Sequence, residues 1–170
     1  MRLTVRRLAD RRPVETSVER DDGVVFEMRG AGGGADLPHD LVHALVETEL
    51  RVTDGIWGCV ADGVVWNSMR HVSGRQPPHA GERSAALKRE RAARVQHAEG
   101  LADVVARLAR GAEVLPAEIG ATGHRPDQLT AAAAALREAQ RAWAALRPGE
   151  VQVVEWPAAG CGRRSPRRGG

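Results

Sequence analysis

Two histidines spaced four residues apart form the clearest chemical motif in the chain. The segment HDLVH contains His39 and His43, with Asp40 between them and Glu47 one helical turn later. Residues four apart on a helix project in nearly the same direction, so both imidazoles can hold one metal ion. We therefore predict His39 and His43 as ligands of a divalent metal such as zinc, and Asp40 and Glu47 as candidate catalytic carboxylates.

A third ligand is expected from outside this segment. Glu47 follows His39 by eight residues, which is roughly 12 Å along an ideal helix axis, so these two side chains would hardly reach one ion. The side chains that could complete the site are two aspartates and two histidines further along the chain: Asp54, Asp62, His71 and His79.

A simpler interpretation of the same segment requires no metal. On a helix, the polar residues of this region share one side and the leucines and valines share the other, as on any amphipathic helix that packs against a sheet. The polar side comprises His39, Asp40, His43, Glu47 and Arg51. The sequence alone favours this interpretation, in which the polar side faces solvent.

The HDxxH pattern resembles two groups of zinc proteins. In the HExxH zinc peptidases, the residue after the first histidine is the general base, and Asp40 takes that place with a side chain one methylene shorter. In the zinc-binding family of ubiquinone biosynthesis, a glutamate follows HDxxH after eleven further residues. Here the residue at that place, the twelfth after His43, is Gly55, and Asp54 precedes it. The stretches LPHDLVHALVETEL and GIWGCVADG also resemble small uncharacterised actinobacterial proteins, a likeness that implies no activity.

Alternating hydropathy predicts a three-stranded antiparallel meander over the first thirty residues. Leu3 and Val5 share one face of the first strand, and two further runs alternate in the same way. An Asp-Gly pair after the second run is typical of a tight hairpin. A late run from Glu150 to Trp156 alternates again, and we expect it to join the same sheet because a lone strand leaves its backbone groups unpaired.

Four helices are predicted between the meander and the late strand. Apolar residues recur there with helical spacing, and proline or glycine stands near the ends of the runs. The expected ranges are 38–50, 56–66, 82–110 and 127–147, with loops at 73–81 and 113–126. The predicted fold class is α+β, a small antiparallel sheet packed against four helices. Core packing is the role expected of the tryptophans, which are Trp57, Trp66, Trp143 and Trp156.

Length and composition predict one α+β domain over residues 1–157 and a disordered basic tail over 158–170. A chain of 170 residues with 42% hydrophobic content can bury a core of its own. The tail AAGCGRRSPRRGG has too few apolar side chains to pack. No run predicts a membrane span or an export signal, and two distant cysteines predict no disulfide framework. We expect a cytoplasmic protein that does not bind a membrane.

Two functions follow as hypotheses. The first is an accessory or protein-interaction module without catalysis, which binds a protein partner through the charged helix around Lys88 and the polar helix at His39. The alternative is a metal-dependent enzyme, such as a hydrolase, that uses the HDxxH helix. The net charge of +3 is weak evidence about partners. The four arginines in the tail predict only weak contact with nucleic acid.

Overall fold

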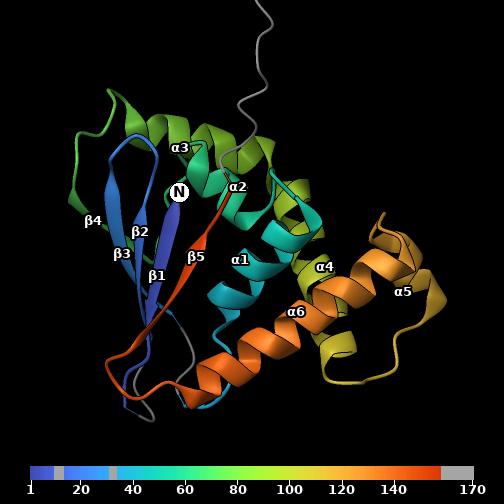
Figure 1. Cartoon of the computed structure of the whole chain (residues 1–170). Helices are drawn as coiled ribbons and strands as arrows, with labels where there is room; N and C mark the ends of the chain where they lie inside the picture. Colours follow the sequence, from blue (N-terminus) through green and yellow to red (C-terminus); the bar gives the residue numbers. More distant parts are fainter. Residues whose placement is uncertain (10–13, 31–33, 158–170) are drawn as a thin grey trace, which may run out of the picture.

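The computed structural model describes residues 1–9, 14–30 and 34–157, so the predicted tail at 158–170 lies outside the described residues. One antiparallel sheet forms one side of the molecule, and the larger helices cover one of its faces (Figure 1). The fold class is therefore α+β, as predicted. Within the described residues, every helix is too short or too polar to cross a bilayer.

The sheet has five strands in the order β4-β3-β2-β1-β5, and all neighbours are antiparallel. Their bounds are β1 Arg2–Arg6, β2 Val14–Glu19, β3 Val25–Gly30, β4 Met69–Ser73 and β5 Val151–Glu155. The meander is confirmed, and so is the pairing of the late strand, which places Val154 opposite Leu3. Strand β4 was not predicted, because it is an edge strand in which only Met69 is buried and no clear alternation results.

Six helices occupy the described residues, where four were predicted. Their bounds are α1 His39–Leu50, α2 Ile56–Ala61, α3 Ala80–Glu90, α4 Ala92–Ala109, α5 Pro116–Ala121 and α6 Pro126–Ala145. The predicted helix at 82–110 is divided at Arg91, whose φ of −100° and ψ of 8° leave the helical region. No proline or glycine marks that break. The guanidinium of Arg91 instead contacts Asp62, 29 residues earlier, at 2.5 Å.

Two apolar clusters hold the layers together. The first lies between the inner face of the sheet and helices α1 and α2, and it contains the fully buried Trp57, Trp143 and Trp156. The second lies among α1, α4 and α6 around Val105 and Leu129. Helix α1 belongs to both clusters, so its side chains are covered from several directions. This double packing decides the environment of the HDxxH motif.

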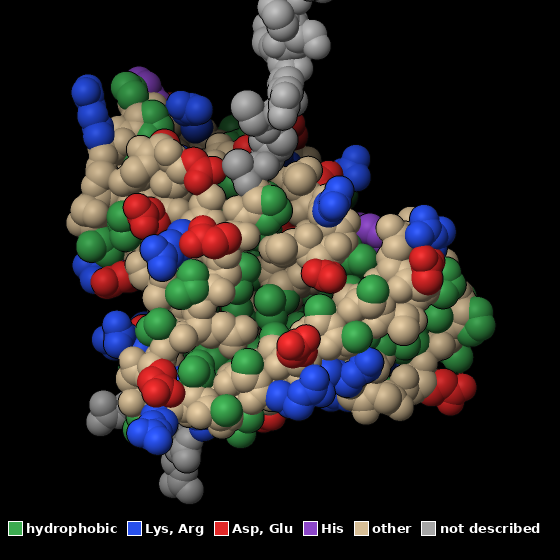
Figure 2. All heavy atoms as spheres, in the orientation of Figure 1, with side chains coloured by type: hydrophobic (Ala, Val, Ile, Leu, Met, Phe, Trp, Pro, Cys, Tyr) green, Lys and Arg blue, Asp and Glu red, His purple; other side chains and the backbone are tan. Residues whose placement is uncertain are grey.

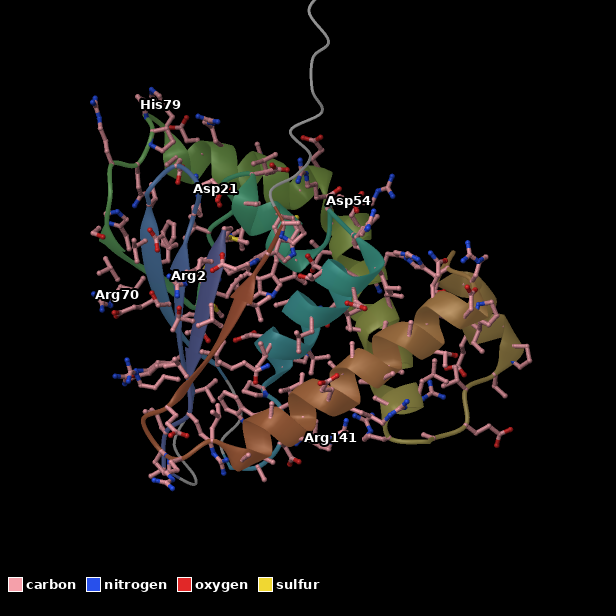
Figure 3. The ribbon with its side chains drawn as sticks, in the orientation of Figure 1. Arg2, Asp21, Asp54, Arg70, His79 and Arg141 are labelled. Carbon is pink, nitrogen blue, oxygen red and sulfur yellow. The ribbon has the colours of Figure 1, made fainter. Side chains whose placement is uncertain are left out.

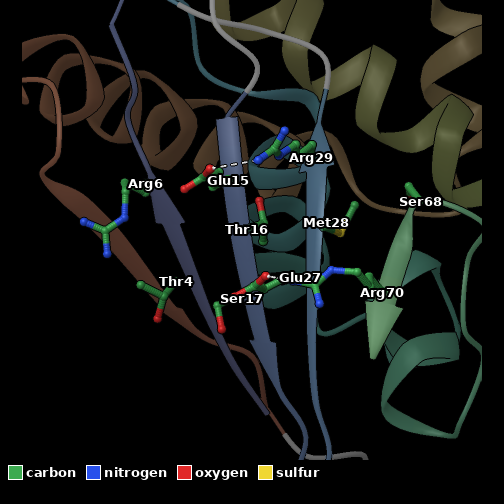
Figure 4. Close-up of a pocket in the computed structure, with 10 residues that line it drawn as sticks. All are labelled: Thr4, Arg6, Glu15, Thr16, Ser17, Glu27, Met28, Arg29, Ser68 and Arg70. Carbon is green, nitrogen blue, oxygen red and sulfur yellow. Dashed lines mark hydrogen bonds and ion pairs between the residues drawn. The ribbon is translucent and has the colours of Figure 1, made fainter. Parts of the chain in front are cut away.

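The opposite face of the sheet is exposed and carries paired charges. Figure 4 shows Glu15 beside Arg29, at 3.7 Å, and Glu27 beside Arg70, at 2.5 Å. These side chains belong to a cavity of about 560 Å³ on the open face. Because each guanidinium of these pairs has a carboxylate on the neighbouring strand, the charges on this part of the face neutralise one another.

Candidate metal centre

Helix α1 brings the two histidines together at its first turns. The helix begins at His39, directly after Pro38, whose fixed φ suits the start of a helix. The Nε2 atoms of His39 and His43 lie 3.3 Å apart, and the ring centroids are 4.5 Å apart. The prediction that these two side chains lie within reach of each other is confirmed.

A carboxylate from a different helix completes the cluster. Oε2 of Glu99, on α4, lies 3.1 Å from Nε2 of His43 and 3.6 Å from Nε2 of His39. Glu99 immediately follows Ala98, which begins the buried stripe by which α4 packs in the core. It therefore stands at the border between the packed and the exposed sides of α4, next to the start of α1.

The three atoms have the spacing that a tetrahedral metal ion requires. The circle through atoms separated by 3.1, 3.3 and 3.6 Å has a radius of about 1.9 Å, so a point about 2.05 Å from all three lies about 0.7 Å above their plane. Zinc bonds to imidazole nitrogen and carboxylate oxygen are about 2.0–2.2 Å long, and a tetrahedral ion lies at about that height above three of its ligands. The cluster thus fits three ligands and leaves a fourth position.

Burial differs sharply within the cluster. His43 is only 2% exposed, whereas the side chains of His39 and Glu99 are 64% and 48% exposed. Desolvation lowers the pKa of His43; the carboxylate of Glu99 raises it, and His39 lowers it further. These effects together favour the neutral imidazole, which is the form that binds a metal. His43 is the buried anchor, and the other two residues form the accessible side.

The polar contacts of the His43 ring are all on one side. Its Nε2 atom faces His39 and Glu99, while its Nδ1 atom is buried without a hydrogen-bond partner among the described residues. A buried polar atom without a partner is energetically unfavourable. The Nε2 atom is therefore the one that faces the other two residues of the cluster.

The structure places Glu47 away from this cluster. Its carboxylate is 1% exposed and accepts hydrogen bonds from the backbone N–H groups of Trp57 and Gly58 at 3.1–3.2 Å. It therefore supports the first turn of α2. Burial raises the pKa of Glu47 to about 7, although these N–H donors favour the ionised form and oppose the shift.

Asp40 also points in another direction from the two histidines. Its Oδ2 atom is buried, has no partner among the described residues, and faces Gly30 at the end of β3. Burial raises the pKa of Asp40, an effect opposed by His39 and increased by Glu99. The charges of His39 and Glu99 thus influence the pKa of Asp40, whereas the carboxylate of Glu47 accepts hydrogen bonds from α2.

None of the four residues predicted as a third ligand belongs to the cluster. Asp54 faces Arg94 at 3.4 Å, Asp62 contacts Arg91, His71 Nε2 lies 3.0 Å from the carbonyl of Gly74, and His79 lies near Glu82. Figure 3 shows Asp54 and His79 well apart from each other near the upper edge of the molecule. The third residue is Glu99. Its surroundings, QHAEGLADVV, contain no motif, so only the packing of α4 on α1 shows that it lies beside the histidines.

The prediction of a solvated polar side on α1 is wrong for its centre. His43 and Glu47 are as buried as the apolar core, because α4 covers the first and the start of α2 covers the second. Only His39 and Glu49 on this helix are exposed, as is Arg51 directly after its end. A polar side that is buried has to find polar partners, and here it finds a carboxylate and two backbone N–H groups.

Comparison with known proteins adds no further assignment. No protein-family model, no curated protein and no solved structure matches the chain. The resemblances of the HDxxH segment to zinc proteins, and of the longer stretches to actinobacterial proteins, therefore stay predictions.

Proposed function

We propose that this protein binds a divalent transition metal, zinc above all, through His39, His43 and Glu99. The observation that carries the proposal is the triangle of Nε2, Nε2 and Oε2 atoms with sides of 3.1–3.6 Å. Two imidazoles and one carboxylate are ligands that suit zinc, and hard cations such as Mg²⁺ prefer oxygen alone.

The reaction class that such a centre supports is metal-dependent hydrolysis. Three protein ligands leave one position of a tetrahedral ion for water, and zinc lowers the pKa of bound water to about 7. His43 would fix the ion from the core, and the exposed His39 and Glu99 would hold it at the surface. Of the two predicted catalytic acids, Asp40 lies beside His39 in the first turn of α1, but its Oδ2 atom faces Gly30; the carboxylate of Glu47 is held by α2.

Metal analysis of purified protein tests the proposal. We expect about one zinc per chain after loading and desalting, and a rise of the melting temperature with added zinc. The variants His39→Ala and Glu99→Gln should weaken zinc binding about 100-fold or more while the protein stays folded, because both side chains are exposed.

The matched control is His97→Ala, which removes an exposed histidine from the same turn of α4 without touching the cluster. It should bind zinc like the unchanged protein. Equal zinc binding by the unchanged protein and by the Glu99→Gln variant would contradict the proposal.

A module without catalysis is the second candidate, and helix α3 favours it. Among the residues Ala80–Glu90, only Ser84 is buried, so the helix presents nearly all of its charged surface to solvent. Lys88 lies over the ring of Trp66, 5.4 Å from its centroid. If the protein binds no metal, α3 is the surface through which we expect it to bind a protein partner.

A further inference from the structure

A second cavity, separate from the three metal-site residues, lies between helices α1, α4 and α6. Its volume is about 600 Å³, which is within the usual range of about 300–1,000 Å³ for small-molecule sites. The cavity has an apolar part made by Leu37, Val42, Ala106, Ala109 and Leu136. Its polar part is made by Arg110, Arg137 and Arg141, together with Asp36 and Gln140.

Among the described arginines, some form ion pairs with carboxylates and others form none, and three of the unpaired ones meet at this cavity. Arg2, Arg29, Arg70, Arg91, Arg94, Arg107 and Arg125 each form an ion pair with a carboxylate. Within the described part of the chain, Arg110, Arg137 and Arg141 form none, even though Asp36 lines the same cavity. Three positive charges beside one negative charge leave this site with an excess of positive charge.

The positions of these arginines carry an energetic penalty. Arg137 and Arg141 are four residues apart on α6, and like charges at that spacing repel each other and destabilise a helix. Arg137 is oriented by the carbonyl of Leu108, near the end of α4, at 3.5 Å. In Figure 2 a row of basic side chains follows the lower edge of α6, and Figure 3 labels Arg141 there. A bound anion would remove the repulsion.

We propose that this cavity binds a small amphipathic anion, with an aliphatic body and one carboxylate or phosphate group. The apolar part between the helices would take the aliphatic body, because burial of apolar surface is favourable. The guanidinium groups would take the anionic group, for which paired N–H donors are well suited. This proposal does not depend on the metal centre, and the two are tested separately.

Calorimetric titration of the full chain with decanoate and with decyl phosphate, both below their micelle concentrations, tests the proposal. Decanol and inorganic phosphate serve as probes that carry only the chain or only the charge. We expect at least one of the two decyl anions to bind at least about 10-fold more tightly than either of these probes. Comparison of the two anions identifies the preferred head group.

Variants locate the binding. Arg110→Gln and Arg141→Gln should each weaken binding of the decyl anion about 10-fold, and Ala106→Phe should weaken it by filling the cavity. The control is Arg89→Gln, because Arg89 is exposed on α3 and forms no ion pair with the described residues. This variant should change the affinity for the decyl anion less than about 2-fold. Decanol that binds as tightly as both anions, or cavity variants that bind like the control, would overturn the proposal.

Discussion

Two ionisable side chains on α1 are buried for different purposes. His43 faces a carboxylate and a second imidazole, so its Nε2 atom belongs to the candidate ligand set. Glu47, one turn later, faces the backbone N–H groups at the start of α2. The helix repeat places both on one side, but the element that covers each residue determines its role. Chemistry at the residue scale is therefore decided by neighbours that are distant in sequence.

The buried Glu47 should make the stability of the protein depend on pH. Its pKa is about 7 in the folded protein and 4.5 ordinarily, so the folded state binds the proton more tightly than the unfolded state. The free energy of unfolding should therefore fall as the pH rises from about 4.5 to about 7, by about 3 kcal/mol from this group. Urea unfolding at several pH values measures this decline.

The variant Glu47→Gln should lose this part of the decline, because an amide does not titrate in that range. Glu49→Gln is the matched control, since Glu49 lies on the same helix but is exposed. It should decline with pH as the unchanged protein does. A Glu47→Gln variant whose decline is as steep as that of the control would show that Glu47 stays ionised when buried.

At the scale of elements, helix α2 depends on a close contact with the segment before it. Gly58 is buried inside α2, and a Cβ atom at this position would overlap the carbonyl oxygen of Thr53. The absence of a side chain at Gly58 thus permits this close approach. This approach also brings the N–H groups of Trp57 and Gly58 to Glu47.

The variant Gly58→Ala should lower the free energy of unfolding by about 1–3 kcal/mol, because the loop or the helix has to move. Gly100→Ala on α4 is the opposite case, since a Cβ atom there meets nothing within 4 Å. This control should raise stability by roughly 0.5–1 kcal/mol through helix propensity. Thermal or urea unfolding of the two variants checks both signs, and equal stability of both would contradict the close contact.

At the scale of the whole molecule, strand β5 joins the last described segment of the chain to the first strand. It pairs with β1, and the N–H of Trp156 donates to the carbonyl of Met1 at 2.9 Å. The N-terminal ammonium group donates in turn to the carbonyl of Trp156 at 3.3 Å. Trp156 is fully buried in the cluster beneath the sheet. Without β5, the sheet and the core beneath it are therefore incomplete.

Deletion of residues 150–170 should unfold the domain or nearly so. Loss of a buried tryptophan alone removes about 3–5 kcal/mol, and a domain has only about 5–15 kcal/mol in total. Truncation after Pro157 is the control, and we expect it to keep the melting temperature of the full chain. Circular dichroism melting curves compare the two. A protein without β5 that melts as late and as cooperatively as the full chain would contradict this role.

Local patterns in the sequence were enough to predict the meander, the late strand and the pair of histidines. Alternation along β1 and the spacing of His39 and His43 depend only on backbone geometry, which repeats every two or every 3.6 residues. The same rules fail for strand β4, where pairing with β3 rather than burial defines the strand. They also fail at Arg91, where a contact with Asp62 accompanies a break that no glycine or proline announces.

The candidate site shows the same division. Its two histidines are neighbours on one helix, so the sequence determined their proximity. Glu99 lies 56 residues after His43, and only the packing of α4 on α1 brings its carboxylate to 3.1 Å. Tertiary packing also decided that His43 is buried by α4 and Glu47 by the start of α2, because a helical periodicity shows which residues share a side but not what covers it. Contacts between distant segments depend on the whole core, and the tertiary structure alone supplies them.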